Sequence, residues 1–160
     1  MTMTAGLSAD EQTAWRTFLR AHATLVRRLE GELVRDHDLP LASYDVLVQL
    51  SEAPEGGLRM TELAERVLLS RSGLTRLVDR LVRDGLVERR SCPEDARGTV
   101  AVLTAAGGER LSTAWPTHLR GVAEHLSRLE PAEVAQLTAL LVKLVPGAAT
   151  GPTTCGAAED

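Results

Sequence analysis

Apolar residues recur every three or four positions along most of the chain, a spacing that predicts a mainly helical protein. The first helix is expected to begin at a capping box, Ser8 to Glu11, and to run to about Asp36. Its apolar stripe consists of Trp15, Phe18, His22, Leu25, Leu29 and Leu33. A second helix carries Tyr44, Leu47, Val48 and Leu50, before the breaker-rich segment 53–57 ends it.

The middle of the chain predicts two short helices and a small sheet. Residues 58–60 favour a short strand, after which Thr61 caps a third helix and Ser70 caps a fourth. Gly85 supplies the left-handed residue that ends the fourth helix. Residues 87–91 and 99–103 then predict two strands, with residues 92–98 as the hairpin loop between them.

Two further helices follow the hairpin. Thr104 is expected to cap a fifth helix that reaches about Leu129, with a kink or a restart at Pro116. Pro131 suits the first turn of a sixth helix, whose apolar face holds Val134, Leu137, Leu140, Leu141 and Leu144. Residues 146–160 are small, polar and rich in breakers, so we expect a disordered tail.

This order of helices and strands predicts a mainly α protein with a small β-wing, that is, a winged helix-turn-helix joined to a helical dimerisation region. In such a fold one helix enters the major groove of DNA and the hairpin reaches the adjacent minor groove. Residues 39–104 would form the winged DNA-binding domain. Residues 8–38 and 105–145 would form the dimerisation region, because their apolar stripes exceed what one small domain can cover.

Charge is distributed unevenly in a way that supports contact with DNA. The whole chain of 160 residues has a formal net charge of −4. Residues 66–98, in contrast, hold eight arginines and five acidic residues, a locally basic segment that can face phosphates. A mixed-charge surface exposed to solvent would show the same counts, so charge alone leaves both interpretations open.

The predicted fourth helix carries the side chains suited to base contact. Arginine pairs with guanine, and hydroxyl side chains contact bases or phosphates. Gly73 costs helix stability but allows close approach of a backbone to DNA. The residues expected to contact the major groove are Ser70, Arg71, Ser72, Gly73, Thr75 and Arg76.

Two motifs resemble the MarR family of transcriptional regulators. Asp95-Ala96-Arg97-Gly98, followed by Val102-Leu103-Thr104 and Gly107, resembles that family's wing signature. The segment LSRSGLTRLVDRLVRDGLVERR, residues 69–90, is similar to its recognition helix and first wing strand. The flanking helices fit the family's dimerisation region, so the resemblance covers roughly residues 8–145.

The resemblance implies a homodimeric repressor that binds a palindromic operator, with two recognition helices about 34 Å apart. Arg97 would enter the minor groove, where a narrow A·T-rich sequence attracts arginine, and Asp95 would orient its guanidinium. Many relatives carry a second basic residue where this chain has Ala96, which implies fewer DNA contacts and a shallower salt dependence.

The resemblance also implies a small-molecule effector, aromatic or phenolic, in the cleft between the dimerisation helices and the winged domain. The residues expected to line that site are Trp15, His22, Leu29, Tyr44, Leu50, Met60 and Leu111. In a chain with four aromatic residues, Trp15 and Tyr44 are more often structural residues of the core than ligand contacts.

Other functional classes have weaker support. Peroxide-sensing relatives carry a cysteine in the first helix, and this chain has only Cys92 and Cys155, so we expect an unreactive Cys92 despite its neighbouring arginines. His118 and His125 are seven positions apart, unlike a zinc-binding pair, so we expect each histidine to be hydrogen-bonded or exposed.

No motif for phosphate binding or nucleophilic catalysis is present, so we expect no enzyme, metal or cofactor. The chain lacks a run of 18 apolar residues and a secretory signal, so a cytoplasmic location without membrane contact is expected. The remaining alternative is a winged-fold helical dimer that binds a small molecule or a protein without reading DNA.

Overall fold

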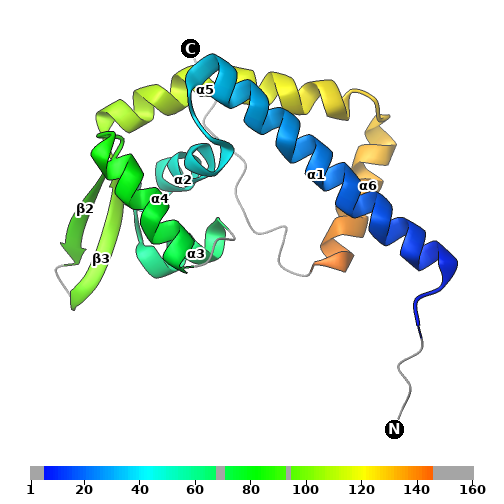
Figure 1. Ribbon diagram of the computed structural model, residues 1–160, viewed down its shortest axis with the longest axis horizontal. Helices are drawn as coiled ribbons and strands as arrows, with labels where there is room; N and C mark the ends of the chain where they lie inside the picture. Colours follow the sequence, from blue (N-terminus) through cyan, green and yellow to red (C-terminus); the bar gives the residue numbers. More distant parts are fainter. Residues whose placement is uncertain (1–5, 68–70, 93–94, 146–160) are drawn as a thin grey trace, which may run out of the picture.

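The computed structural model describes residues 6–67, 71–92 and 95–145. The described chain holds six α-helices, a short 3-10 helix and one three-stranded antiparallel sheet (Figure 1). The expectation of a mainly helical protein with a small sheet is confirmed. The predicted cap Ser70 and the predicted tail, residues 146–160, lie outside the described residues.

Helix α1, Ala9–His37, is the long first helix that the pattern predicts. The Ser8 hydroxyl accepts a hydrogen bond from the Glu11 backbone at 3.2 Å, and the Ser8 backbone donates to the Glu11 carboxylate at 2.7 Å. This capping box confirms the predicted start. At the other end Asp38 takes the left-handed conformation, with φ of 48° and ψ of 39°, and its backbone N–H bonds to Val34.

Helix α2, Leu41–Ser51, is followed by the 3-10 helix η1, Pro54–Gly56, the strand β1, Gly57–Arg59, and the helix α3, Met60–Arg66. The expected strand, 58–60, is therefore wrong by one position. The expected cap, Thr61, is wrong by two positions. The Glu62 carboxylate accepts a hydrogen bond from the Arg59 backbone at 3.1 Å, which makes Arg59 the cap residue.

Helix α4, Arg71–Arg83, ends as predicted. Gly85 has φ of 74°, and the Leu86 backbone donates to the Leu81 carbonyl at 2.9 Å, which closes the last turn.

The hairpin strands β2, Val87–Cys92, and β3, Asp95–Leu103, are longer than predicted. The proposed loop at 92–98 is wrong, because β3 already includes Asp95 to Gly98. A register shift between Ser91 and Cys92 lets the pairing continue into this polar stretch. β3 lies in the centre of the sheet, between β1 and β2.

Helix α5, Ala105–Leu126, begins as predicted, with the Thr104 hydroxyl accepting from the Gly107 backbone at 3.0 Å. The helix is continuous across Pro116, so the expected restart does not occur, and it ends at Leu126 rather than Leu129. Pro116 is exposed, so the carbonyl that loses its partner at proline can bond to water instead.

The core joins α2, α4 and α5 to the sheet and to the end of α1. Its fully buried large side chains include Leu33, Tyr44, Leu47, Leu50, Leu63, Leu74, Leu81, Val78 and Val87. No helix in the described ranges is long and apolar enough to cross a membrane.

The helix α6, Pro131–Leu144, begins with proline as predicted but buries none of its residues in this chain. It lies beyond the end of α5, away from the winged part of the molecule (Figure 1). The side chains Leu137, Leu140, Leu141, Val142 and Leu144 are exposed, as are Trp15, Leu19, Leu25 and Val26 on α1.

Candidate nucleic-acid interface

Helix α4 has one buried face and one exposed face. Leu74, Leu77, Val78 and Leu81 are buried against the core, which fixes the orientation of the helix about its axis. The opposite face exposes Ser72, Thr75, Arg76, Asp79, Arg80 and Arg83 to solvent. A helix held by its apolar side and exposing hydroxyl and guanidinium groups on the other can enter a DNA groove.

An arginine from the sheet connects α4 to the wing. Arg89 on β2 pairs with Asp79 of α4 at 2.7 Å, and it also donates to the Thr75 carbonyl at 3.5 Å. Both side chains of the ion pair are partly exposed, so the pair adds little stability. The pair is a direct side-chain contact between the helix and the first wing strand.

A hollow of about 410 Å³ lies between α4, the wing and β1. Arg59 and Arg89 contribute guanidinium groups to its lining, and Thr75 and Thr99 contribute hydroxyls. The N-terminal end of α4 and the far ends of β2 and β3 lie on the same side of the molecule, opposite α5 (Figure 1). One ligand surface can therefore contact both the helix and the wing.

The structure places most of the predicted DNA-contact residues on these two elements. Arg71 is the first residue of α4, and Ser72, Gly73, Thr75 and Arg76 follow within its first two turns. Asp95 and Arg97 lie on β3 rather than in a loop. Asp95 pairs across the hairpin with Cys92.

Comparison with known proteins identifies the relatives of this chain. The profile of the MarR family matches residues 37–98. YkoM, an HTH-type transcriptional regulator of Bacillus subtilis, is 35% identical over 142 residues, which cover 86% of this chain and 91% of the relative. The chain belongs to the MarR family.

Solved structures of the MarR family show the same fold. Sco3205 of Streptomyces coelicolor, a MarR family transcriptional regulator in complex with DNA, is 36% identical, with a TM-score of 0.84. The match covers 90% of this chain and 91% of the Sco3205 chain. A mutant of MarR from E. coli complexed with operator DNA is 28% identical, with a TM-score of 0.78. The match covers 89% of this chain and 100% of the E. coli chain. This protein is thus a MarR-family transcriptional regulator with a winged helix-turn-helix.

The predicted effector residues fall into two groups. Tyr44, Leu50 and Leu111 are buried in the core, with Met60 packed at its edge and Leu29 half-buried on α1. Trp15 and His22 are exposed near the N-terminal end of α1, where both stack on Phe18. Within one chain the second group belongs to a separate surface.

An aromatic cluster around Tyr44 was only partly anticipated from the sequence. The Tyr44 ring lies 4.5 Å from the His118 ring and 6.4 Å from the Trp115 ring, both on α5. His118 Nδ1 is buried and has no hydrogen-bond partner among the described residues, so the expectation that it is hydrogen-bonded or exposed is wrong for this atom. Burial lowers the pKa of His118 below its ordinary value, which favours the neutral ring at pH 7.

Arg89 belongs to the interface but was not among the predicted contact residues, although it lies in an arginine-rich strand. Its pairing with Asp79 depends on the antiparallel sheet that brings β2 beside α4, which no local pattern specifies.

His37 bonds to the Thr117 hydroxyl at 2.8 Å. Over the described ranges, no three His, Cys, Asp or Glu side chains group closely enough to hold a metal ion.

Proposed function

We propose that the protein is a homodimeric repressor that binds an inverted-repeat operator and is released from it by a small-molecule effector. The exposed polar face of α4, joined to the wing through Arg89, is the observation that carries the proposal. DNA complexes of the Streptomyces coelicolor and E. coli relatives support it.

In the proposed complex the first two turns of α4 enter the major groove. Arg71, Ser72, Thr75 and Arg76 would contact base edges, and Arg97 would occupy the adjacent minor groove with Asp95 setting its orientation. Arg89 has a different role, since its guanidinium is engaged by Asp79. It would hold the helix and wing at the separation that the two grooves require.

Dimerisation would cover the apolar surface that one chain leaves exposed. Leu137, Leu140 and Leu144 on α6 and Trp15 and Leu19 on α1 face solvent in the isolated chain. Such a large apolar surface marks a protein interface. Trp15 and His22 lie on the same part of α1. In the proposed dimer, these two side chains of one chain would complete an effector site around Tyr44 of the other chain.

Fluorescence anisotropy tests this proposal. Wild type, Arg97→Ala and the control Arg28→Ala would be titrated against the DNA upstream of the protein's own gene and a random duplex over a salt series. Arg28 is exposed on α1, away from α4 and the wing. Sequence-preferring binding that weakens in Arg97→Ala alone is the expected result.

If wild type prefers no fragment in a genome-wide selection of bound DNA, the repressor proposal fails. A winged-fold dimer that binds a small molecule or a protein without DNA would then be the better description. The intact face of α4 favours the DNA-binding function.

A further inference from the structure

The winged part, residues 41–115, is connected to the long helices at two places. One is the joint 38–40 between α1 and α2, where Asp38 takes the left-handed conformation. The other is Pro116 inside α5. Proline has no N–H for the carbonyl four positions earlier, so the helix lacks one internal hydrogen bond there and bends more easily. The angle at which the winged part leaves the long helices therefore depends on the contacts that span these two places.

Glu30 of α1 holds the first residue of α2 across the joint. Its Oε2 atom accepts a hydrogen bond from the Leu41 backbone N–H at 2.6 Å. Pro40, the residue before α2, makes no side-chain cap, so a carboxylate from another helix takes that role. The dipole of α2 also favours a negative charge at this end. The direction in which α2 leaves the joint is therefore tied to α1.

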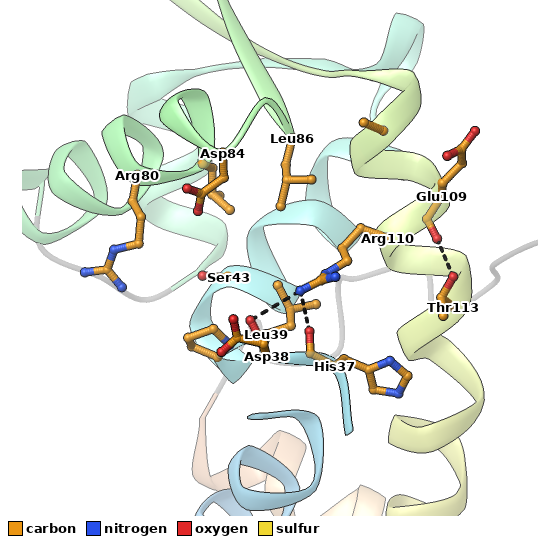
Figure 2. Close-up of a pocket in the computed structure, with 13 residues that line it drawn as sticks. His37, Asp38, Leu39, Ser43, Arg80, Asp84, Leu86, Glu109, Arg110 and Thr113 are labelled. Carbon is orange, nitrogen blue, oxygen red and sulfur yellow. Dashed lines mark hydrogen bonds between the residues drawn. The ribbon is translucent and has the colours of Figure 1, made fainter. Parts of the chain in front are cut away.

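Arg110 makes a second contact with the joint, from the half of α5 before Pro116. Its Nη2 donates to the His37 carbonyl and, at 3.4 Å, to the Asp38 carbonyl (Figure 2). Carbonyls at the end of a helix lack helical partners, and the helix dipole favours a cation there. The buried Nε of Arg110 has no acceptor among the described residues, so the bonds to the end of α1 orient this guanidinium.

The half of α5 after Pro116 is fixed to α1 by its own contacts. The Thr117 hydroxyl shares a hydrogen bond of 2.8 Å with His37 Nε2, and Thr117 is buried. A Cβ on Gly121 would lie 2.7 Å from Leu29 Cδ2, so the two helices are in close contact. We therefore treat α1 and residues 117–126 as one unit, the helical frame. The winged part can change its angle to this frame only at the joint and at Pro116.

The space beside the joint leaves room for such a change. An open hollow of about 710 Å³ lies between the joint, the C-terminal end of α4 and the first half of α5 (Figure 2). Asp38 lines it from the joint, and Arg80 and Asp84 line it from α4. Side chains leave this space open, so packing on this side of the joint does not block rotation of α4 toward α1.

We propose that Glu30 and Arg110 are positioning residues that set the angle between the helical frame and the winged part, and with it the spacing of operator half-sites that the dimer accepts. In a dimer, a change of this angle in both chains moves the two recognition helices apart or together. One base pair changes the half-site separation by about 3.4 Å, so small angular changes decide which spacing fits. The consequence for spacing rests on the proposed homodimeric DNA binding, whereas the two contacts do not.

Fluorescence anisotropy measures the spacing preference. Wild type, Arg110→Met and Glu30→Ala would be titrated against the operator and against duplexes with one or two base pairs inserted or removed between the half-sites. The ratio of affinities for the best spacing and for a spacing one base pair away should fall about tenfold in both variants, which is what one hydrogen bond to a charged group can contribute. Affinity for a single half-site should stay that of wild type, because α4 and the wing are unchanged.

Two control variants separate positioning from a general loss of stability. Glu30→Gln keeps an oxygen that can accept from Leu41, so it should retain the wild-type spacing preference. Arg120→Met removes an exposed arginine of α5 that pairs with Asp36 of α1 at 3.8 Å, away from the joint, and should also retain it. If Arg110→Met does not fold, Glu30→Ala and Glu30→Gln decide the question. An unchanged spacing preference in the folded variants, or an equal loss of affinity at every spacing, would overturn the proposal.

Amide hydrogen exchange tests the same residues without DNA. The Leu41 amide should exchange faster in Glu30→Ala, and also in Arg110→Met, which does not contact that amide but releases the joint. The Tyr44 amide, which bonds to the Pro40 carbonyl at 2.9 Å, should keep its wild-type rate in both. Equal protection of Leu41 in all three proteins would refute the positioning role, whatever the protein does with DNA. The expected exchange pattern in a wild type without DNA preference would support that role and refute only the repressor function.

Discussion

Arg76 is the residue at which we expect a single exposed side chain to carry sequence preference. It lies in the second turn of α4 on the face opposite the buried Leu74 and Val78, so its guanidinium projects to solvent. We expect Arg76→Ala to cost about 1–3 kcal/mol of specific binding and to relax preference at one base pair, because a bidentate contact to guanine is lost. Anisotropy with operator variants at each position measures both effects.

The control for Arg76 is Arg28→Ala, which removes an equally exposed arginine from α1. It should leave specific binding unchanged. An equal loss of affinity for operator and random DNA in Arg76→Ala would assign this residue to the phosphate backbone instead.

The raised pKa of Asp45 predicts that the stability of the fold depends on pH. Desolvation raises the pKa of its carboxyl from 3.8 to about 6, and the nearby Glu30 adds to this rise, although Asp45 is an exposed residue of α2. A raised pKa in the folded state gives stability that is complete below pH 3.8 and is lost as the pH rises through 6. Asp45→Asn stays neutral and should avoid that loss.

Thermal unfolding between pH 4 and pH 7.5 measures this difference. Asp45→Asn should melt close to wild type at pH 4 and at a higher temperature above pH 6, whereas Glu65→Gln on the exposed face of α3 should show no such trend. A constant offset between Asp45→Asn and wild type at all pH values would contradict the assigned cause.

At the scale of elements, Gly107 determines how closely α5 packs against the wing. A Cβ at this position would lie 2.1 Å from the Leu86 carbonyl oxygen and 2.7 Å from Leu103 Cδ1. The obstacle is mainly backbone, so we expect Gly107→Ala to destabilise the fold by about 1–3 kcal/mol. Gly108 has no atom within 4 Å of its Cβ position, so Gly108→Ala should stabilise the helix by up to about 1 kcal/mol.

Urea unfolding of the two alanine variants separates packing from helix propensity. Opposite signs of the change in unfolding free energy are expected for these adjacent positions. Similar changes for both would mean that helix propensity alone determines the effect, and that the close approach to Leu86 does not.

The link between α4 and β2 predicts a change in specificity with little change in stability. Asp79→Asn removes the ion pair with Arg89, and such partly exposed pairs contribute about 0.2–1 kcal/mol to folding. We expect the ratio of specific to random DNA binding to fall, because helix and wing lose their fixed separation. Glu88→Gln is the control, since Glu88 pairs with Arg90 on the same strand and does not contact α4.

Elements with a local signal were predictable from the sequence. The Ser8 capping box, the Thr104 cap and the left-handed Gly85 each depend on residues a few positions apart, and all three occur as expected. The wing strands were placed too short because their length depends on pairing across the sheet. The Arg89–Asp79 link and the packing of Tyr44 on Trp115 and His118 depend on contacts between distant segments, so local patterns contain no signal for them.

At the scale of the whole molecule, one chain leaves a large apolar surface exposed. The winged part has a buried core, whereas α6 and the N-terminal half of α1 leave an apolar surface exposed. Apolar positions at 137, 140, 141 and 144 recur with helical spacing, although no part of the chain that the structure describes covers them. This spacing is what a helix packed against a partner requires.

Leu141→Glu should therefore dissociate the proposed dimer. A charge placed in the apolar interface would be desolvated without a partner on association, which costs far more than an exposed charge does. Light scattering after size-exclusion chromatography should give twice the 17.2 kDa of one chain for wild type and a single chain for the variant. Gln136→Glu adds the same charge to a neighbouring polar position and should remain dimeric. A dimeric Leu141→Glu would exclude this face of α6 from the interface, and a monomeric wild type would refute the dimer.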